Sequence, residues 1–175
     1  ISASHYNIRQ IIEDLNQNLW TFEDNTLIAC NRKNEIISKT LNEINICNLC
    51  RDGIGNIWLI DTSGNIKKVY LQKDEIVVES LTSEVVSDIS FDVLYSTIDD
   101  EGCMWAISTV GSVYKSNSQK DHLEQIANVD SLLIGTSPMD LLSKGNYIYF
   151  LTRKQLTILN RKDLHPLNHR KEPLE

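Results

Sequence analysis

Short apolar runs recur along the chain, and each of them lies between two turns. The clearest are pairs of an apolar residue and a large aromatic residue: Leu19-Trp20, Ile57-Trp58, Met104-Trp105 and Ile148-Tyr149. The aromatic residues of successive pairs are 38, 47 and 44 residues apart. Short apolar runs bounded by Gly, Asn, Asp and Ser are typical of β-strands. The pattern predicts an all-β chain built from four copies of one small unit.

Polar residues stand at fixed distances from these aromatic residues. Six residues before each Trp lies an aspartate: Asp14, Asp52 and Asp99. Ser143 takes this place in the fourth unit. Turn-forming residues lie three positions before each aromatic residue: Gln17, Gly55, Gly102 and Asn146. A second turn follows each aromatic strand: Asn25, Gly64, Gly111 and Lys154. Because a carboxylate can accept backbone N–H bonds inside its own turn, we expect these aspartates to be structural.

Each unit divides into four short strands. In the second unit these are expected at residues 46–51, 56–61, 65–71 and 75–81. The outer strands of the other units are expected at 35–41, 122–129 and 164–169. The four units then span approximately 6–45, 46–86, 87–131 and 132–170. Weak helical periodicity occurs at 8–15 and 132–142, where the phase of the repeat predicts strands, and residues 82–91 are expected to form a loop or an extra turn.

At these residues the chain resembles the two-component-regulator type of β-propeller repeat. The signature is an Asp, a Gly, an aliphatic-Trp pair and a second Gly, which the second unit matches with Asp52, Gly55, Ile57-Trp58 and Gly64. The resemblance implies blades of four antiparallel strands around a central channel, and the four units then predict about four blades. An open row of four blades would expose sheet faces and strand edges, so we expect it to be part of a larger propeller that further chain or a partner completes. In that family, propellers usually form the ligand-sensing part of a bacterial membrane sensor.

The charge balance argues against two classes of partner. The chain carries 17 Lys and Arg against 24 Asp and Glu, a formal charge of −7. Nucleic acids and anionic membrane surfaces need a dense cationic surface, so neither is expected as a partner. No apolar run has the length of a membrane-spanning helix. The chain begins with Ile1 rather than Met and ends in Leu174-Glu175, which suggests a fragment of a longer protein.

Candidate chemistry is sparse. Cys47 and Cys50 form a C-x-x-C, but a second close pair is missing and the segment is expected to be a strand that points the two thiols to opposite faces. Buried free thiols and a reducing, cytoplasmic compartment are therefore favoured over zinc, redox chemistry or a periplasmic or extracellular sensor. The four His residues are expected at the surface: His5, His122, His165 and His169. The acidic turn 99–102 is interpreted as solvated rather than as a Ca²⁺ site, and the basic segment from Arg153 to Lys171 as a solvated edge.

We therefore expect no enzyme, no cofactor and no metal, but a scaffold that binds another protein. The turns after the Trp strands are the candidate binding face: Asp24, Asn25, Asp61, Ser63, Gly64, Thr109 and Gly111. One alternative is the ligand-sensing lobe of a signalling receptor, which binds a small molecule or glycan fragment. A second is a tectonin-like lectin with exposed aromatic residues, such as Tyr70, Tyr114 or Tyr147.

Overall fold

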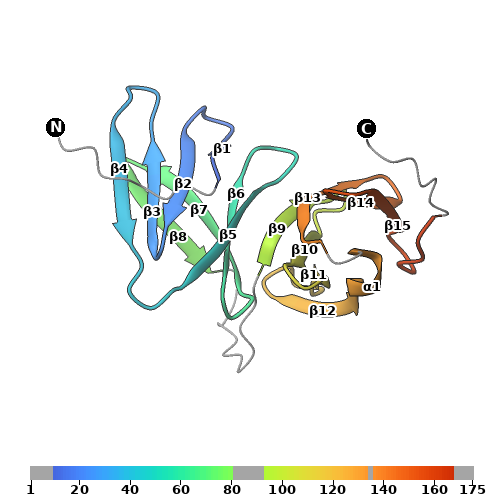
Figure 1. Ribbon diagram of the computed structural model, residues 1–175. Helices are drawn as coiled ribbons and strands as arrows, with labels where there is room; N and C mark the ends of the chain where they lie inside the picture. The colour runs from blue at the N-terminus through green and yellow to red at the C-terminus, as the bar shows by residue number, and fades with distance from the viewer. Residues whose placement is uncertain (1–9, 81–92, 134–135, 168–175) are drawn as a thin grey trace.

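The computed structural model describes residues 10–80, 93–133 and 136–167. Within these ranges the chain forms four antiparallel sheets, in each of which the strands follow one another in chain order (Figure 1). Sheet 1 contains β1 (Ile12–Glu13), β2 (Leu19–Glu23), β3 (Thr26–Cys30) and β4 (Ile36–Thr40). Sheet 2 contains β5 (Ile46–Arg51), β6 (Ile57–Asp61), β7 (Ile66–Gln72) and β8 (Glu75–Ser80).

The second half of the chain continues the pattern. Sheet 3 contains β9 (Val93–Ile98), β10 (Met104–Ser108), β11 (Ser112–Ser116) and β12 (Leu123–Asn128). Sheet 4 contains β13 (Pro138–Lys144), β14 (Tyr147–Thr152) and β15 (Leu156–Asn160). The all-β prediction is thus confirmed, with one short helix as the exception. No helix in the described ranges is long and apolar enough to cross a membrane.

Two predictions about the fourth unit need correction. The expected outer strand at 164–169 is reduced to a single bridge in the described residues, between Leu159 and Pro166. Asn160 N donates to His165 O at 3.0 Å and Leu167 N donates to Ile158 O at 2.9 Å on either side of this bridge, and residues 168 and 169 lie outside the described residues. Leu164 has a φ of 57°, so its backbone is not extended and no strand begins there. The segment 132–142 was expected to be a strand throughout, but helix α1 (Asp130–Leu133) precedes β13. Asn128 Oδ1 accepts the backbone N–H of Asp130 at 2.8 Å, and this bond starts the turn. The expected loop at 82–91 lies outside the described residues.

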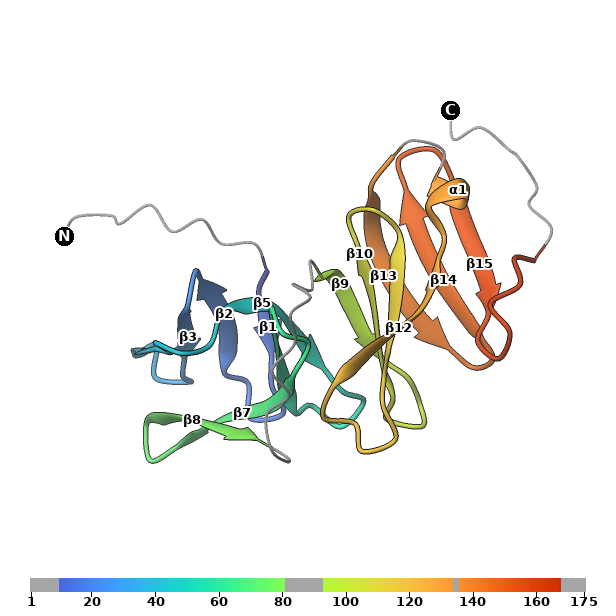
Figure 2. The same ribbon diagram turned by 90° about the horizontal axis from the view of Figure 1, so that it is seen from below.

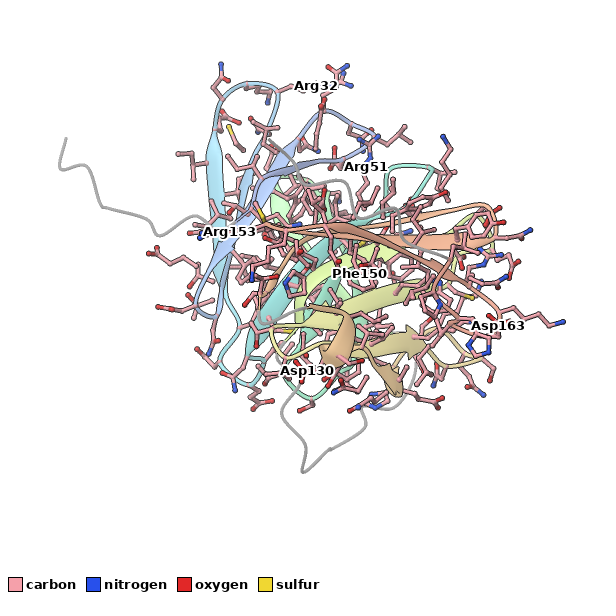
Figure 3. All side chains as sticks on the ribbon, turned by 45° about the vertical axis from the view of Figure 1, so that its right-hand side comes forward. Arg32, Arg51, Asp130, Phe150, Arg153 and Asp163 are labelled. Atoms are coloured by element: carbon pink, nitrogen blue, oxygen red, sulfur yellow. The ribbon has the colours of Figure 1, made fainter. Side chains whose placement is uncertain are left out.

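The four sheets pack face to face in a row (Figures 1 and 2). Three clusters of buried apolar side chains join sheet 1 to sheet 2, sheet 2 to sheet 3 and sheet 3 to sheet 4. No core cluster of the described residues joins sheet 4 back to sheet 1. Figure 3 shows Phe150 inside the third cluster, whereas Arg32, Arg153 and Asp163 lie on the outside.

The same kind of face meets the next sheet each time. Trp20 packs in one cluster with Leu59 of sheet 2, and Trp105 packs in another with Phe150 of sheet 4. Trp58 packs against the cluster that contains Met104 of sheet 3. The face of each sheet that carries the aromatic residue therefore covers the aliphatic face of the following sheet. Successive side chains along each strand alternate between these two faces.

Backbone hydrogen bonds tie neighbouring sheets together at their turns. Leu15 N donates to Gly55 O at 3.0 Å, which joins the first turns of sheets 1 and 2. Gly55 has a φ of 91°, and a Cβ there would lie 2.8 Å from the Cβ of Leu15. Glycine is needed at this position both for the left-handed backbone and for the close approach of the two turns.

Candidate functional site

The repeated aspartates bind the repeated tryptophans. In each of the first three sheets, the indole N–H donates to the carboxylate six residues earlier: Trp20 Nε1 to Asp14 Oδ2 at 2.9 Å, Trp58 Nε1 to Asp52 Oδ2 at 3.0 Å and Trp105 Nε1 to Asp99 Oδ2 at 2.8 Å. A buried indole N–H needs an acceptor, and an ionised acceptor gives a strong bond. This bond fixes the aromatic side chain to the turn that precedes its strand.

Each carboxylate also organises its own turn. Asp52 Oδ1 accepts the backbone N–H groups of Ile54 at 3.1 Å and Asn56 at 2.8 Å. Asn56 Nδ2 donates to Asp52 Oδ2 at 2.7 Å, beside the bond from Trp58. Sheet 1 repeats this arrangement around Asp14, with Asn18 in the place of Asn56. Both carboxylate oxygens are therefore engaged by donors of their own turn and strand.

Sheet 3 replaces the asparagine with Cys103, and a residue of sheet 4 supplies the missing donor. Arg161 Nη1 lies 3.0 Å from Asp99 Oδ2, whose side chain is 1% exposed. The same guanidinium bonds Asp100 Oδ1 at 2.7 Å and also Glu101 Oε1. The interpretation of this turn and of Arg161 as solvated was therefore wrong for Asp99 and Arg161, because the ion pair links the two sheets.

Sheet 4 lacks both members of the pair. Tyr149 stands in the place of Trp and Ser143 in the place of Asp. A phenol ring has no indole N–H, so a carboxylate at position 143 would have no indole donor. The Trp and the Asp are thus both replaced in this sheet, which indicates that the sequence signal of the repeat is the pair rather than either residue alone.

The pH dependence of stability should report on the carboxylate of Asp52. Burial opposes its ionised form, but the bonds from Asn56, Trp58 and the backbone outweigh burial and hold the pKa below its ordinary value. A lowered pKa stabilises the fold above the unfolded value of about 3.9, and this stabilisation is lost as the pH falls through the folded pKa. We expect urea midpoints to fall more steeply between about pH 5 and pH 3 for the wild type than for Asp52→Asn. Equal slopes for the two proteins would exclude this role.

The C-x-x-C segment does not behave as a regular strand. The register between β5 and β6 shifts between Ile46 and Asn48, and this bulge resets the alternation of side chains. Cys47 and Cys50 therefore both pack toward sheet 3, against the expectation of opposite faces. All four cysteines are free thiols.

Thiol labelling should distinguish Cys50 from Cys103. Burial raises the pKa of the Cys50 thiol to about 11, and the side chain is 4% exposed. Since the thiolate is the reactive form, we expect iodoacetamide at pH 8 to modify Cys50 about a hundredfold more slowly than the half-buried Cys103. Mass spectrometry of peptides gives the rates, and labelling in urea is the control, in which the difference should vanish. Similar rates in the folded protein would show that Cys50 is accessible.

The candidate turns after the Trp strands are not equally accessible. Asn25 Nδ2 bonds Asn45 Oδ1 at 3.0 Å, and Thr62 N donates to Asn45 O at 2.8 Å, so Asn45 joins the first two turns. Asp61 and Gly64 are buried, and Gly64 O accepts from Leu123 N of sheet 3 at 2.8 Å.

The remaining candidate positions keep local partners. Asp61 Oδ1 accepts the backbone N–H of Ser63 at 2.9 Å, and Gly111 O accepts that of Val129 at 2.8 Å. Asp24 has a φ of 49°, as its place in a tight turn requires. Thr109 is half-buried in the third turn. Contacts within and between the sheets therefore already engage much of this candidate face.

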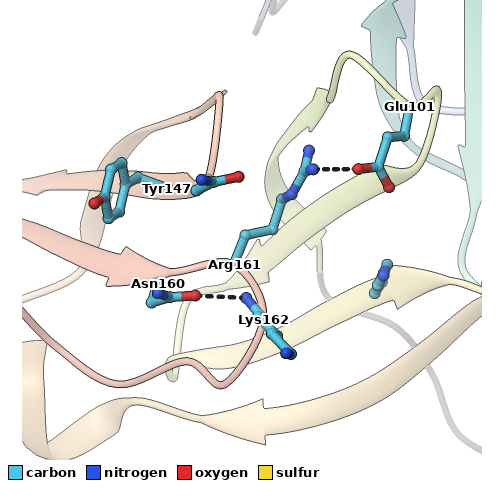
Figure 4. A pocket seen from close by; sticks show the side chains of 7 residues that line it. Glu101, Tyr147, Asn160, Arg161 and Lys162 are labelled. Carbon is cyan, nitrogen blue, oxygen red and sulfur yellow. Dashed lines mark hydrogen bonds and ion pairs between the residues drawn. The ribbon is translucent and has the colours of Figure 1, made fainter.

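A polar pocket of about 510 Å³ lies where sheets 3 and 4 meet (Figure 4). It is lined by Glu101, Lys115, Asn146, Tyr147, Asn160, Arg161 and Lys162. Lys115 Nζ lies 5.1 Å from the centre of the Trp105 ring, and the backbone N–H of Lys162 donates to Asn160 Oδ1 at 2.8 Å. These side chains can bind an anionic or hydroxylated molecule, but the lining includes no pair of nucleophile and base.

Three residues next to this pocket have metal-ligating atoms within 4.8 Å of one another: Asp99, Glu101 and Cys103. The guanidinium of Arg161 already lies against both carboxylates. A cation would have to displace it, so the geometry favours the ion pair.

The histidines and tyrosines singled out in the sequence are spread over the molecule. His165 is exposed and His122 is half-buried, whereas His5 and His169 lie outside the described residues. Tyr114 is buried, which removes it as an exposed aromatic residue for a lectin. Tyr70 is half-buried, and Tyr147 lines the pocket.

Comparisons with known proteins bear on the fold. No protein-family model matches the sequence, and no curated protein matches it. Virginiamycin B lyase from Staphylococcus aureus matches in structure with a TM-score of 0.66 at 11% identity, over 95% of this chain and 56% of that chain. YCF48 from Cyanidioschyzon merolae matches with a TM-score of 0.62 at 14% identity, over 89% of this chain and 52% of that chain. The fold is a β-propeller.

Sheets 1 to 4 are accordingly blades 1 to 4. The extracellular domain of a protein described as the hybrid two component system BT4673 from B. thetaiotaomicron also matches, with a TM-score of 0.51 at 15% identity, over 95% of this chain and 30% of that chain. The propeller fold implied by the repeat signature is thus confirmed, in a divergent form. The chain spans only about half the length of the lyase and of YCF48. At these identities the likeness shows the fold and not the activity.

Proposed function

We propose that this propeller segment is a non-catalytic scaffold that binds another protein through the face of blade 4 that points away from blade 3. The proposal rests on the composition of this face, which we call the outer face of blade 4. Its apolar and aromatic residues are Leu142, Tyr147, Tyr149, Leu151, Leu156 and Ile158. Their strand neighbours Ile148, Phe150 and Leu159 are buried against blade 3.

The outer face of blade 4 has a contiguous apolar centre, which exposed charged residues flank, with Lys144 beside Tyr147 and Asp140 beside Leu151. Leu142, Tyr149 and Ile158 are direct cross-strand neighbours, and Leu151 pairs with Leu156 in the next row. Leu142 is 52% exposed and Leu156 is 51% exposed. A contiguous exposed apolar patch with aromatic residues is typical of a protein-binding surface, whereas scattered exposed apolar residues are not.

The non-catalytic part of the proposal is supported by the state of the repeated acidic groups. Asp14, Asp52 and Asp99 are engaged with indole and backbone N–H groups, as structural turns require. The lyase likeness, at 11% identity, carries no argument for activity. We also propose a reducing, cytoplasmic compartment, which the four free thiols favour.

The polar pocket favours a second candidate function, the binding of a small anionic or hydroxylated molecule by a sensing lobe. Arg161, Lys115 and Lys162 supply positive charge, and Asn146 and Asn160 supply amide groups for hydrogen bonds. Titration calorimetry with a panel of organic anions and sugars tests this candidate. Arg161→Ala should abolish such binding, whereas binding to the outer face of blade 4 should not require Arg161.

Affinity capture with matched variants tests the main proposal. Tyr149→Glu changes the outer face of blade 4, Val110→Glu changes the candidate turns after the Trp strands, and Ile54→Glu changes a turn at the other end of the strands. Val110 is 61% exposed and Ile54 is 71% exposed, so both variants should fold. We expect only Tyr149→Glu to lose the captured proteins. Loss with Val110→Glu alone would assign binding to the turns instead.

A further inference from the structure

The polar pocket between blades 3 and 4 presents charges of both signs to a ligand. Its lining holds three cationic side chains and one carboxylate, but the charge of Arg161 is already neutralised. The Arg161 guanidinium pairs with all three carboxylates of the turn 99–102, and its side chain is 13% exposed. Among the lining residues, the cations that can still meet a ligand are therefore Lys115 and Lys162.

The charges around this pocket balance. Five cationic residues line it or neighbour its lining residues in the chain, in register or through a hydrogen bond: Lys115, Lys120, Lys144, Arg161 and Lys162. Five anionic residues line it or neighbour its lining residues in the chain, in register or through an ion pair: Asp99, Asp100, Glu101, Glu124 and Asp163. Equal numbers of both signs exert no net attraction on a simple anion. A ligand that itself carries both signs can find a partner for each of them.

The lining holds the two signs apart. Lys115 Nζ lies 5.1 Å from the centre of the Trp105 ring, and this contact fixes its ammonium group at the pocket. Glu101 bonds Arg161 through Oε1, so Oε2 is the oxygen that can accept from a ligand, and the side chain is 65% exposed. In Figure 4, Glu101 and Lys162 lie on different sides of Arg161. The pocket therefore offers an anion partner and a cation partner at separate points.

Two amide side chains add partners of a third kind. Asn160 Oδ1 accepts the backbone N–H of Lys162 at 2.8 Å, so its Nδ2 group is the part that can donate to a ligand. Asn146 lines the pocket from the first turn of blade 4, and its amide can donate to a carboxylate or accept from an ammonium group. The volume of about 510 Å³ lies in the range of small-molecule sites, about 300–1,000 Å³.

We propose that this pocket binds a small zwitterion of the α-amino-acid class. The ligand carboxylate meets Lys115 and Lys162, and its ammonium group meets Glu101. This inference rests on the second candidate function and names the class of its ligand. A simple anion would use only the lysines, and a neutral sugar would leave the charges on both sides without a partner.

Titration followed by nuclear magnetic resonance tests the ligand class with serine, glutamine and leucine. Each amino acid is compared with its N-acetyl form, which keeps only the carboxylate charge, and with its amide, which keeps only the ammonium charge. We expect at least one amino acid to bind at least about tenfold more tightly than both of its derivatives. The side-chain amide signals of Asn146 and Asn160 should shift on binding.

Charge-removing variants assign the two ends of the ligand. Lys115→Met keeps an apolar stem on the Trp105 ring and loses the charge, so it should weaken the amino acid at least about tenfold and leave its amide unaffected. Glu101→Gln should also weaken the amino acid but leave its N-acetyl form unaffected. Lys33→Gln, an exposed change on blade 1, is the control and should alter neither affinity.

The outcomes separate this inference from the proposed function. Amino acids that bind no more tightly than their N-acetyl forms overturn the zwitterion, whereas Arg161-dependent binding of organic anions would still support the second candidate function. Absence of binding by all three amino acids up to about 10 mM also overturns it, as does binding that Lys115→Met and Glu101→Gln both leave unchanged. Protein capture by the outer face of blade 4 does not depend on any of these results. Circular dichroism identifies a variant that fails to fold, and Lys115→Gln then replaces Lys115→Met.

Discussion

Trp105→Ala is expected to lower the free energy of unfolding by about 3–5 kcal/mol, the range for deletion of a fully buried aromatic side chain. Trp105 is 1% exposed and packs among Ile107, Val113 and Phe150 between blades 3 and 4. The substitution leaves a cavity between the two sheets, removes the donor to Asp99 and removes the ring beneath Lys115. Urea unfolding followed by circular dichroism measures the change.

Trp58→Ala is the matched control for this prediction. Trp58 makes the same bond to its aspartate but is only half-buried, so its removal should cost less than that of Trp105. A loss below about 1 kcal/mol for Trp105→Ala would show that blades 3 and 4 do not pack through this side chain.

Asp99→Ala should cost a similar amount, about 3–5 kcal/mol, although it removes no apolar surface. Asp99 accepts bonds from Trp105 Nε1 at 2.8 Å, Cys103 N at 2.8 Å and Glu101 N at 2.9 Å. Its loss leaves these donors unsatisfied, and it leaves Arg161 without its most buried carboxylate. Asp52→Ala is the comparison, and its cost should be smaller because water reaches the half-buried Asp52.

A double-mutant cycle identifies the indole bond within this total. Trp105→Phe keeps an aromatic ring but has no N–H to donate to Asp99. We expect Asp99→Ala to cost about 1–2 kcal/mol less in the Trp105→Phe background than in the wild type. Strict additivity of the two changes would mean that the bond contributes nothing to stability.

Much of the fold could be predicted because the repeat is carried by residues that local physics requires. An indole N–H needs an acceptor, and a tight turn needs a residue such as Gly55 with a positive φ. Both requirements recur in each repeat unit, so residues such as Asp52 and Gly55 reveal the repeat in the sequence. The predicted outer strand of blade 4 is reduced to one bridge, because Leu164 has a φ of 57° and the backbone is not extended where the repeat phase places the start of the strand.

The candidate binding surface on blade 4 was harder to predict, because the exposure of a sheet face depends on which other elements pack against it. The alternation of Tyr147, Tyr149 and Leu151 with Ile148 and Phe150 indicates a strand with two apolar faces. Nothing in that alternation says which face is covered, since this is decided by the position of blade 4 at the end of the row. Arg161 was missed for a similar reason, although Cys103 in place of an asparagine was a signal that another donor was needed.

The central claim is that each aromatic face covers the following blade. Nuclear Overhauser contacts from the three indole rings test it most directly. Cross-peaks are expected from Trp20 to blade 2, from Trp58 to blade 3 and from Trp105 to blade 4. Cross-peaks from any of these rings to the preceding blade, or to its own sheet alone, would contradict the claim.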